Sequence, residues 1–176
     1  MEVLERKLET NKTKTDYSKV VWFYDFWSWL TESKATGYVI KFSEIKDGET
    51  ILEIACGTGV VFGKIVKQNP NGKNIGIDLS PDMLNKAKKR LNKLKSGNYE
   101  LREGDVLKLG FNDNSFDLVV NNFMVDLMPS GTFDKLAEEF YRVTKPDGRV
   151  VISTFSFGKK KSIDFGFGLL KNSLTF

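Results

Sequence analysis

The chain has 176 residues, of which 40% are hydrophobic and 28% are charged. These values are typical of one globular domain and exclude a disordered, collagen-like or low-complexity chain. The 27 basic and 23 acidic residues leave a net charge of +4, which is too small for the basic stripe of a nucleic-acid-binding domain. We therefore expect no nucleic-acid partner.

The sequence contains no histidine and only one cysteine, Cys56. This excludes an intramolecular disulfide, a His- or Cys-rich metal centre and His-based catalysis, so we expect no metal. Cys56 directly follows a predicted buried strand, and no histidine is present to activate it, which favours a packing role. Met1–Thr15 is charged and lacks the apolar segment of a signal peptide. A cytoplasmic protein is the simplest interpretation.

The most hydrophobic segment is Val20–Leu30, which holds all three tryptophans. It is shorter than the roughly 20 residues that cross a membrane, so we expect no stable membrane insertion. On a helix its aromatic side chains would occupy most of the circumference, and some must face the sheet or a ligand. We expect a single domain made of an N-terminal helical cap, a core and a tail: 1–46, 47–155 and 156–176.

Strands and helices alternate through the core. The predicted strands are Thr50–Ala55, Asn74–Asp78, Tyr99–Glu103, Phe116–Asn121 and Arg149–Thr154. The predicted helices are Val60–Gln68, Pro81–Leu94, with Ser80 as its cap, and Thr132–Val143. This alternation predicts a doubly wound α/β fold with a mainly parallel sheet. Such sheets bind ligands at the carboxyl ends of their strands.

A glycine-rich loop, Cys56-Gly57-Thr58-Gly59, joins the first strand to the following helix. Such a loop lets a ligand approach the backbone, although an empty tight turn has the same sequence. The loop continues to Gly63 with a spacing that differs from the G-x-G-x-x-G of pyrophosphate-binding loops.

Three carboxylates lie in or after the predicted strands. Asp78 ends the second strand, where a carboxylate accepts hydrogen bonds from a ribose diol of a nicotinamide dinucleotide or of S-adenosylmethionine. Glu53 lies inside the first strand, where it suits a ligand with an ammonium and a sulfonium better than a pyrophosphate. Asp105 follows the third strand and either binds an adenine amino group, with Val106 against the ring, or caps a turn.

Five motifs in chain order resemble the class I S-adenosylmethionine-dependent methyltransferases, and most closely those of ubiquinone and menaquinone biosynthesis. They are Glu53-Ile54-Ala55-Cys56-Gly57-Thr58-Gly59, Gly76-Ile77-Asp78-Leu79-Ser80 with Met83, Gly104-Asp105-Val106, Phe116-Asp117-Leu118-Val119-Val120 and Lys145-Pro146-Asp147-Gly148-Arg149. The resemblance covers about Val20 to Phe155. It implies a Rossmann-like sheet of order 3-2-1-4-5 beneath N-terminal helices.

The resemblance also implies S-adenosyl-L-methionine as cofactor and a set of binding residues. Those around the methionine portion are Glu53, Ala55, Gly57, Thr58 and Gly59. The remaining residues are Asp78 at the ribose, Leu79 and Met83 at the adenine face, Asp105 and Val106 at the adenine edge, Asn121 near the sulfonium, and Tyr24 reaching in from the N-terminal cap.

The sequence departs from the family at two places. Members often carry a histidine after the fourth strand, where this chain has Asp126. Tyr24 and Asp126 are the catalytic candidates, and Asp25, solvent or a reaction without deprotonation are the alternatives. After the fifth strand only Ser156–Phe176 follow, enough for one short helix, so the last two strands of the family would be missing. The edge of the fifth strand would then be bare and open to a homodimer, unless Phe165–Leu170 covers it.

We therefore expect methyl transfer from S-adenosylmethionine to a small apolar or amphiphilic acceptor that resembles a quinol, a phenol or a lipid. Direct displacement at the methyl group needs little acid catalysis, so the lack of histidine is no obstacle. Two alternatives stay open at this point: a non-catalytic S-adenosylmethionine-binding module and a nicotinamide-dependent oxidoreductase.

Overall fold

The computed structural model describes residues 35–94, 98–157 and 163–171, and side chains as far as residue 154 with the exception of Asp126. Tyr24 and the aromatic segment Val20–Leu30 lie outside the described residues. Of the predicted N-terminal cap, the structure describes residues 35–46, in which 35–43 are helical.

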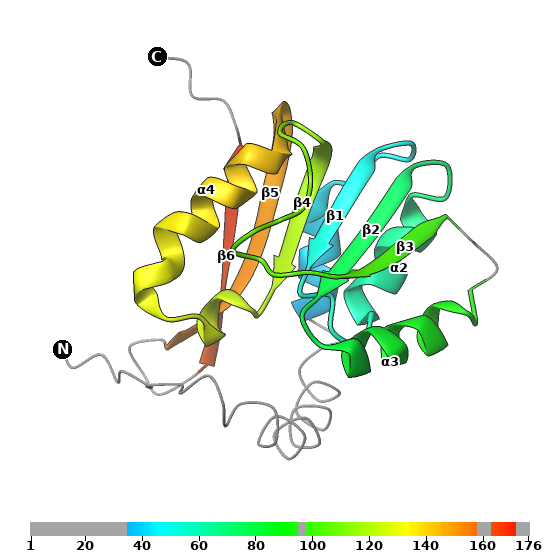
Figure 1. Cartoon of the computed structure of the whole chain (residues 1–176), viewed down its shortest axis with the longest axis horizontal. Helices are drawn as coiled ribbons and strands as arrows, with labels where there is room; N and C mark the ends of the chain where they lie inside the picture. The colour runs from blue at the N-terminus through cyan, green and yellow to red at the C-terminus, as the bar shows by residue number, and fades with distance from the viewer. Residues whose placement is uncertain (1–34, 95–97, 158–162, 172–176) are drawn as a thin grey trace.

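A six-stranded sheet forms the centre of the molecule, in the order β3-β2-β1-β4-β5-β6 (Figure 1). The strands are β1 Thr50–Ile54, β2 Lys73–Asp78, β3 Tyr99–Glu103, β4 Phe116–Asn122, β5 Thr144–Phe157 and β6 Ile163–Lys171. The first five are parallel, and β6 is antiparallel to β5. The predicted strand order 3-2-1-4-5 is confirmed.

Helices cover both faces of this sheet, as the sequence predicts. They are α2 Val60–Gln68, α3 Pro81–Leu91 and α4 Phe133–Val143, with short 3-10 turns at η1 Val125–Leu127 and η2 Ser130–Thr132. In Figure 1, α4 lies in front of the sheet and α2 lies behind it, with α3 running below β3. Leu91 of α3 packs with Phe62 and Val66 of α2. The predicted cap of α3 is present, because the Ser80 side chain accepts a hydrogen bond from the Met83 amide.

Burial on both faces explains why β1 carries apolar residues that point to each face of the sheet. Ile51 packs with the core on the α2 side, whereas Leu52 and Ile54 pack with the core on the α4 side. Strands at the centre of a parallel sheet are covered on both faces, so they lack the polar alternation of half-exposed strands. Glu53 is the exception and is itself buried.

The predicted turn at Lys145–Gly148 is a bulge within a longer fifth strand. Phe116 pairs with Thr144 and Leu118 pairs with Arg149, so residues 145–148 lie opposite Asp117 alone. The Asp117 carboxylate accepts a hydrogen bond from the Lys145 ammonium at 2.8 Å and from the Thr50 amide at 2.8 Å. Residues 145–148 therefore belong to the fifth strand, at the amino end of the sheet, and do not form a separate turn before that strand.

The expected bare edge on the fifth strand is wrong, and so is the expected short helix after it. β6 pairs with β5 along its whole length, from Arg149 opposite Lys171 to Phe157 opposite Ile163. The alternative that Phe165–Leu170 covers the edge is thus confirmed. Pairing satisfies backbone groups that a bare edge would leave exposed. In this structure β6 occupies the edge of β5 through which a homodimer was expected to form.

The helices in the described part of the chain are all too short or too polar to cross a bilayer.

Candidate functional site

The loop between β1 and α2 turns sharply at the carboxyl end of the sheet. Ala55, Gly57 and Gly59 adopt left-handed conformations, with φ of 57°, 54° and 76°. Glycine tolerates this region, whereas other residues are strained in it. The loop is tied to β2, because the Cys56 amide donates to the Ile77 carbonyl at 2.9 Å. The predicted loop residues therefore lie at the strand end where the sequence places a ligand.

Asp78 joins this loop to the next one. Its Oδ2 accepts a hydrogen bond from the Gly57 amide at 2.8 Å, and its Oδ1 accepts one from the Ser80 amide at 2.9 Å. Burial raises the pKa of the Asp78 carboxyl, and these backbone hydrogen bonds oppose the shift. Each carboxylate oxygen has a second lone pair, so Asp78 can still accept a hydrogen bond from a ribose hydroxyl.

Glu53 is buried, with 2% of its surface exposed, and its Oε2 has no hydrogen-bond partner among the described residues. Burial raises the pKa of this carboxyl well above its usual range, and the nearby charge of Asp78 raises it further. A buried carboxyl without a partner is costly unless a ligand or a proton satisfies it. The Oε2 of Glu53 can therefore accept a hydrogen bond from a cationic or hydrogen-bond-donating ligand.

Asn121 lies on β4, beside Ile54 of β1. Its Nδ2 donates to the Ile54 carbonyl at 3.0 Å, and its Oδ1 is a second buried acceptor without a described partner. Strand alternation places Glu53 on the face of Ile51 and Asn121 on the face of Val119, which are opposite faces of the sheet. A ligand lying across the carboxyl ends of β1 and β4 could meet both acceptors.

Cys56 is buried and unoxidised. Burial and the neighbouring carboxylates of Glu53 and Asp78 raise the pKa of its thiol. A thiol with a raised pKa is a poor nucleophile. Its Sγ would lie 3.2 Å from a Cβ at Gly76, so the geometry is that of close packing, which agrees with the packing role expected for Cys56.

The residues expected around adenine lie at the ends of β2 and β3. Leu79 is 70% exposed, and Met83 is half-buried in the first turn of α3. The Asp105 carboxylate is exposed and accepts a hydrogen bond from the Leu107 amide at 2.9 Å. The turn-capping role is thus present, and the remaining lone pairs leave room for a ligand. Val106 packs against the α4-side core.

Arg90 is a residue that the sequence analysis missed. Its guanidinium donates from Nε to the Thr58 carbonyl at 3.0 Å, so α3 braces the glycine-rich loop. The two residues are far apart in the sequence, and no local pattern connects them. Of the two catalytic candidates, Tyr24 lies outside the described residues. Asp126 lies in η1, and its side chain is likewise outside the description.

Comparison with known proteins agrees with this geometry. A methyltransferase domain model matches residues 45–170. A demethylmenaquinone methyltransferase of Oceanobacillus iheyensis is 37% identical over 115 residues, which are 64% of this chain and 47% of that protein. An arsenite methyltransferase of Halobacterium salinarum is 34% identical over 113 residues, which are 64% of this chain and 28% of that protein. The chain thus spans about half the length, or less, of these relatives.

Among solved structures, a SAM-dependent methyltransferase from Aquifex aeolicus matches 72% of this chain and 67% of its own chain, with 26% identity and a TM-score of 0.62. The [4+2]-cyclase SpnF matches 73% of this chain and 47% of its own, with 21% identity and a TM-score of 0.65. That second likeness shows the fold alone, and a shared fold does not fix the reaction. The chain belongs to the methyltransferase domain family, and its predicted resemblance to the class I S-adenosylmethionine-dependent methyltransferases is confirmed.

Proposed function

We propose that this protein binds S-adenosyl-L-methionine at the carboxyl ends of β1, β2 and β4 and transfers its methyl group to a small acceptor. The observation that carries the proposal is the buried Glu53 carboxyl, whose Oε2 has no partner among the described residues and which lies just before the glycine-rich loop. An ammonium group would satisfy this acceptor and favour its ionised form. A pyrophosphate would repel it, which argues against a nicotinamide cofactor.

Individual residues have distinct roles in this proposal. Glu53 and the backbone of Gly57 and Gly59 hold the methionine portion, together with Ala55 and Thr58. Asp78 accepts from the ribose hydroxyls, and Asn121 lies on the sulfonium side. Leu79 and Met83 cover one adenine face, while Asp105 and Val106 contact its edge. The exposure of Leu79 supports this role, because a large apolar side chain in solvent gains from a planar partner.

The cofactor supplies an activated methyl group, and a neutral thioether leaves when the acceptor takes that group. The chain's own residues then bind and orient the two molecules and exclude water. Orientation alone can lower the activation free energy by roughly 7–11 kcal/mol. Tyr24 and Asp126 are the candidates for removing a proton from the acceptor.

We propose a small apolar or amphiphilic acceptor, resembling a quinol, a phenol or a lipid. Two large apolar side chains, Leu127 and Phe133, are 46% and 43% exposed in the segment that follows β4. The absence of histidine favours an acceptor whose own proton is acidic. The similarity to a demethylmenaquinone methyltransferase points in the same direction.

Transfer assays with methyl-labelled S-adenosylmethionine test the function. Quinol, phenol and lipid pools are incubated in parallel with tRNA, DNA and peptide pools, and we expect label in the first group. Label mainly in nucleic acid or peptide would refute the acceptor class. Calorimetry with S-adenosylhomocysteine and NADH separates the alternatives: binding of the former without transfer to any pool indicates a non-catalytic module, and binding of NADH alone indicates an oxidoreductase.

Tyr24→Phe and Asp126→Asn test the two catalytic candidates. If either residue accepts the acceptor's proton, its variant lowers the rate of transfer and leaves the affinity for S-adenosylhomocysteine unchanged. Equal rates in both variants and the parent chain would show that neither residue takes the proton.

A further inference from the structure

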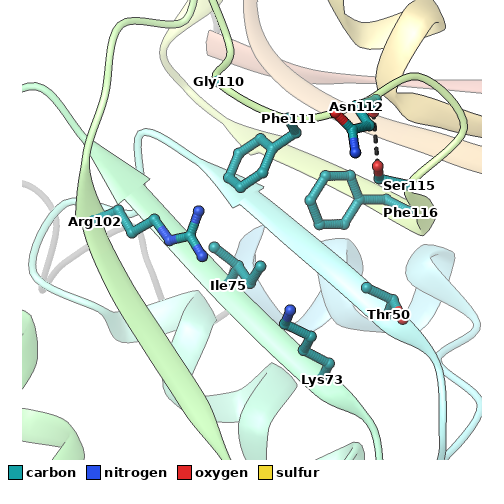
Figure 2. A pocket seen from close by; sticks show the side chains of 9 residues that line it. All are labelled: Thr50, Lys73, Ile75, Arg102, Gly110, Phe111, Asn112, Ser115 and Phe116. Carbon is teal, nitrogen blue, oxygen red and sulfur yellow. Dashed lines mark hydrogen bonds between the residues drawn. The ribbon is translucent and has the colours of Figure 1, made fainter.

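A groove of about 400 Å³ lies on the α4 side of the sheet, at the opposite end from the proposed cofactor site (Figure 2). Thr50 and Lys73, the first residues of β1 and β2, line it. Gly57 and Asp78 follow the other ends of the same strands. At a rise of about 3.3 Å per residue, one strand length of roughly 15 Å separates the two regions. The Lys73 end of the groove is therefore distant from Gly57 and Asp78, whereas Arg102 and Phe111 also line a smaller cavity with Gly104 and Asp105.

The loop that forms one wall of the groove is held firmly by α4. Arg142 donates to the Phe111 carbonyl at 2.7 Å, to the Leu109 carbonyl at 2.9 Å and to the Asp113 carboxylate at 2.8 Å. The Glu139 carboxylate accepts from the Leu109 amide at 2.8 Å. These bonds fix the loop before any ligand arrives, which reduces the entropy cost of binding.

The two cations of the groove, Lys73 and Arg102, outnumber the one carboxylate whose pKa both of them lower, that of Glu100. Arg102 is paired with Glu100, whose Oε2 accepts from Nη2 at 2.9 Å, and its guanidinium lies 5.3 Å from the centre of the Phe111 ring. Lys73 forms no ion pair with a described carboxylate. In Figure 2 the Lys73 ammonium and the Arg102 guanidinium both point into the space over Ile75. This arrangement suits one anionic group.

Aromatic rings lie beside these charges. Phe111 and Phe116 meet edge to face, with their ring centres 5.0 Å apart, and Ile75 lies in the floor. Flat apolar ligands pack well against such rings and floors. Phe111 is only partly buried, and the Arg102 guanidinium lies over its ring, so a ligand's ring would lie against the exposed part of Phe111 beside that guanidinium.

From these charges and rings we infer that the groove is a second small-molecule site, which takes a planar aromatic carboxylate. The carboxylate would lie at Lys73 and the Arg102 guanidinium, and the ring would lie along Phe111 over Ile75. The inference does not depend on methyl transfer, because none of these residues belongs to the proposed cofactor site.

The probe for this site is 2-naphthoate, titrated into the whole ¹⁵N-labelled chain with saturating S-adenosylhomocysteine present. We expect saturable shifts of the amide signals of Ile75, Phe111 and Ser115. Naphthalene-2-methanol has the same ring without the charge, and acetate has the charge without the ring. Both should bind at least threefold more weakly than 2-naphthoate.

Matched substitutions locate the charge. Lys73→Gln should weaken 2-naphthoate about threefold to fivefold, as expected for one partly exposed ion pair. Lys89→Gln removes the same charge from the exposed side of α3 and should leave the affinity unchanged. Lys73 is exposed at the strand start, so its substitution leaves the core intact. Phe111→Leu tests the ring and should also weaken binding.

Several outcomes would overturn the inference. One is the absence of saturable shifts at the groove amides, and another is an equal effect of Lys73→Gln and Lys89→Gln. If naphthalene-2-methanol binds as tightly as 2-naphthoate, the charge plays no part in binding. If acetate binds as tightly as 2-naphthoate, the ring plays no part. Displacement of 2-naphthoate by S-adenosylhomocysteine would show that the two share one site. Failure of S-adenosylhomocysteine to bind would instead count against the proposed function and leave the groove result standing.

Discussion

Single residues at the carboxyl end of the sheet combine structural and binding roles. Asp78 holds two backbone amides in place and also lies where the ribose is proposed to bind. Glu53 has no such structural partner for its Oε2. The two carboxylates should therefore respond differently to substitution.

For Asp78→Asn, we expect the dissociation constant of S-adenosylhomocysteine to rise about 10- to 100-fold. Hydrogen bonds to a charged group contribute roughly 1.5–3 kcal/mol, and the amide keeps the shape of the side chain. Asp82→Asn is the matched control, because Asp82 is exposed in the first turn of α3. Calorimetry measures both. Equal affinities in the two variants would place the ribose elsewhere.

The raised pKa of Glu53 predicts a pH-dependent stability. Between the ordinary glutamate pKa of about 4.3 and the raised value, the folded chain keeps a proton that the unfolded chain releases. Stability due to this group is therefore lost as the pH rises through that window. Glu53→Gln lacks this loss, so its stability relative to the parent chain should improve as the pH rises above the ordinary glutamate pKa.

Urea unfolding at several pH values, without ligand, measures this difference. A difference between the two chains that does not change with pH would show that Glu53 titrates normally. The same substitution should weaken S-adenosylhomocysteine binding, because the neutral amide cannot pair with the ammonium group.

At the scale of elements, the contact between α2 and α3 fixes the glycine-rich loop. A Cβ at Gly59 would lie 3.0 Å from the Cβ of Ala87, and Gly59 has a φ of 76°. A Cβ at Gly63, one turn along α2, would meet only Leu91 and Leu94 side chains at 3.8 Å and 3.9 Å. A side chain can therefore be added at Gly63 without a close contact, but not at Gly59.

Gly59→Ala should destabilise the fold by about 2 kcal/mol or more, because left-handed backbone costs alanine about 1–2 kcal/mol and the contact with Ala87 adds to this. Gly63→Ala should be neutral or stabilising by up to about 1 kcal/mol, since alanine favours helix interiors. Chemical denaturation compares the two variants. Equal destabilisation would mean that the loop conformation differs from the one described.

A second element contact joins residues 35–43 to β5. Arg149 donates to both carboxylate oxygens of Glu49, at 2.7 Å and 2.8 Å, and to the carbonyls of Ser43 and Glu44. Both side chains of the pair are little exposed, at 12% and 13%.

Arg149→Met should cost roughly 3 kcal/mol of stability, because it leaves the Glu49 carboxylate without its partner in a mostly buried place. Arg102→Met breaks an exposed pair and should cost at most about 1 kcal/mol. Thermal unfolding of both variants checks the contrast. Comparable losses would show that the Arg149 pair is no more important than a surface pair.

For the whole molecule, β6 decides whether the sheet ends in a covered or an open edge. β5 is paired on both sides, with β4 and with β6. Deletion of residues 158–176 would expose one side of the apolar Val150–Val151 region of β5. Open strand edges pair with other chains.

We therefore expect the shortened chain to self-associate more strongly than the whole chain, as measured by sedimentation over a range of concentrations. In the whole chain the amides of β5 should exchange slowly with solvent. Rapid exchange along β5 would indicate that β6 does not cover it in solution.

The sequence by itself determined the order of the elements and the direction of the sheet. Buried strands such as Thr50–Ile54 and amphipathic helices such as Pro81–Leu91 are defined by local periodicity, and the loop motifs follow them directly. Strand β3 was predicted with the bounds that it has in the structure, and Ser80 was predicted as the cap of α3. Local patterns suffice for such features, since neighbouring residues in the chain decide them.

Only the tertiary structure decided the features that depend on distant partners. The bulge at 145–148 lies opposite Asp117, and β6 pairs with the edge of β5. The unmatched acceptors of Glu53 and Asn121, the bracing of Thr58 by Arg90, and the groove between Lys73 and Phe111 all join residues from different elements. No periodicity encodes such pairings, because burial and hydrogen bonding at each residue are set by what the fold brings beside it.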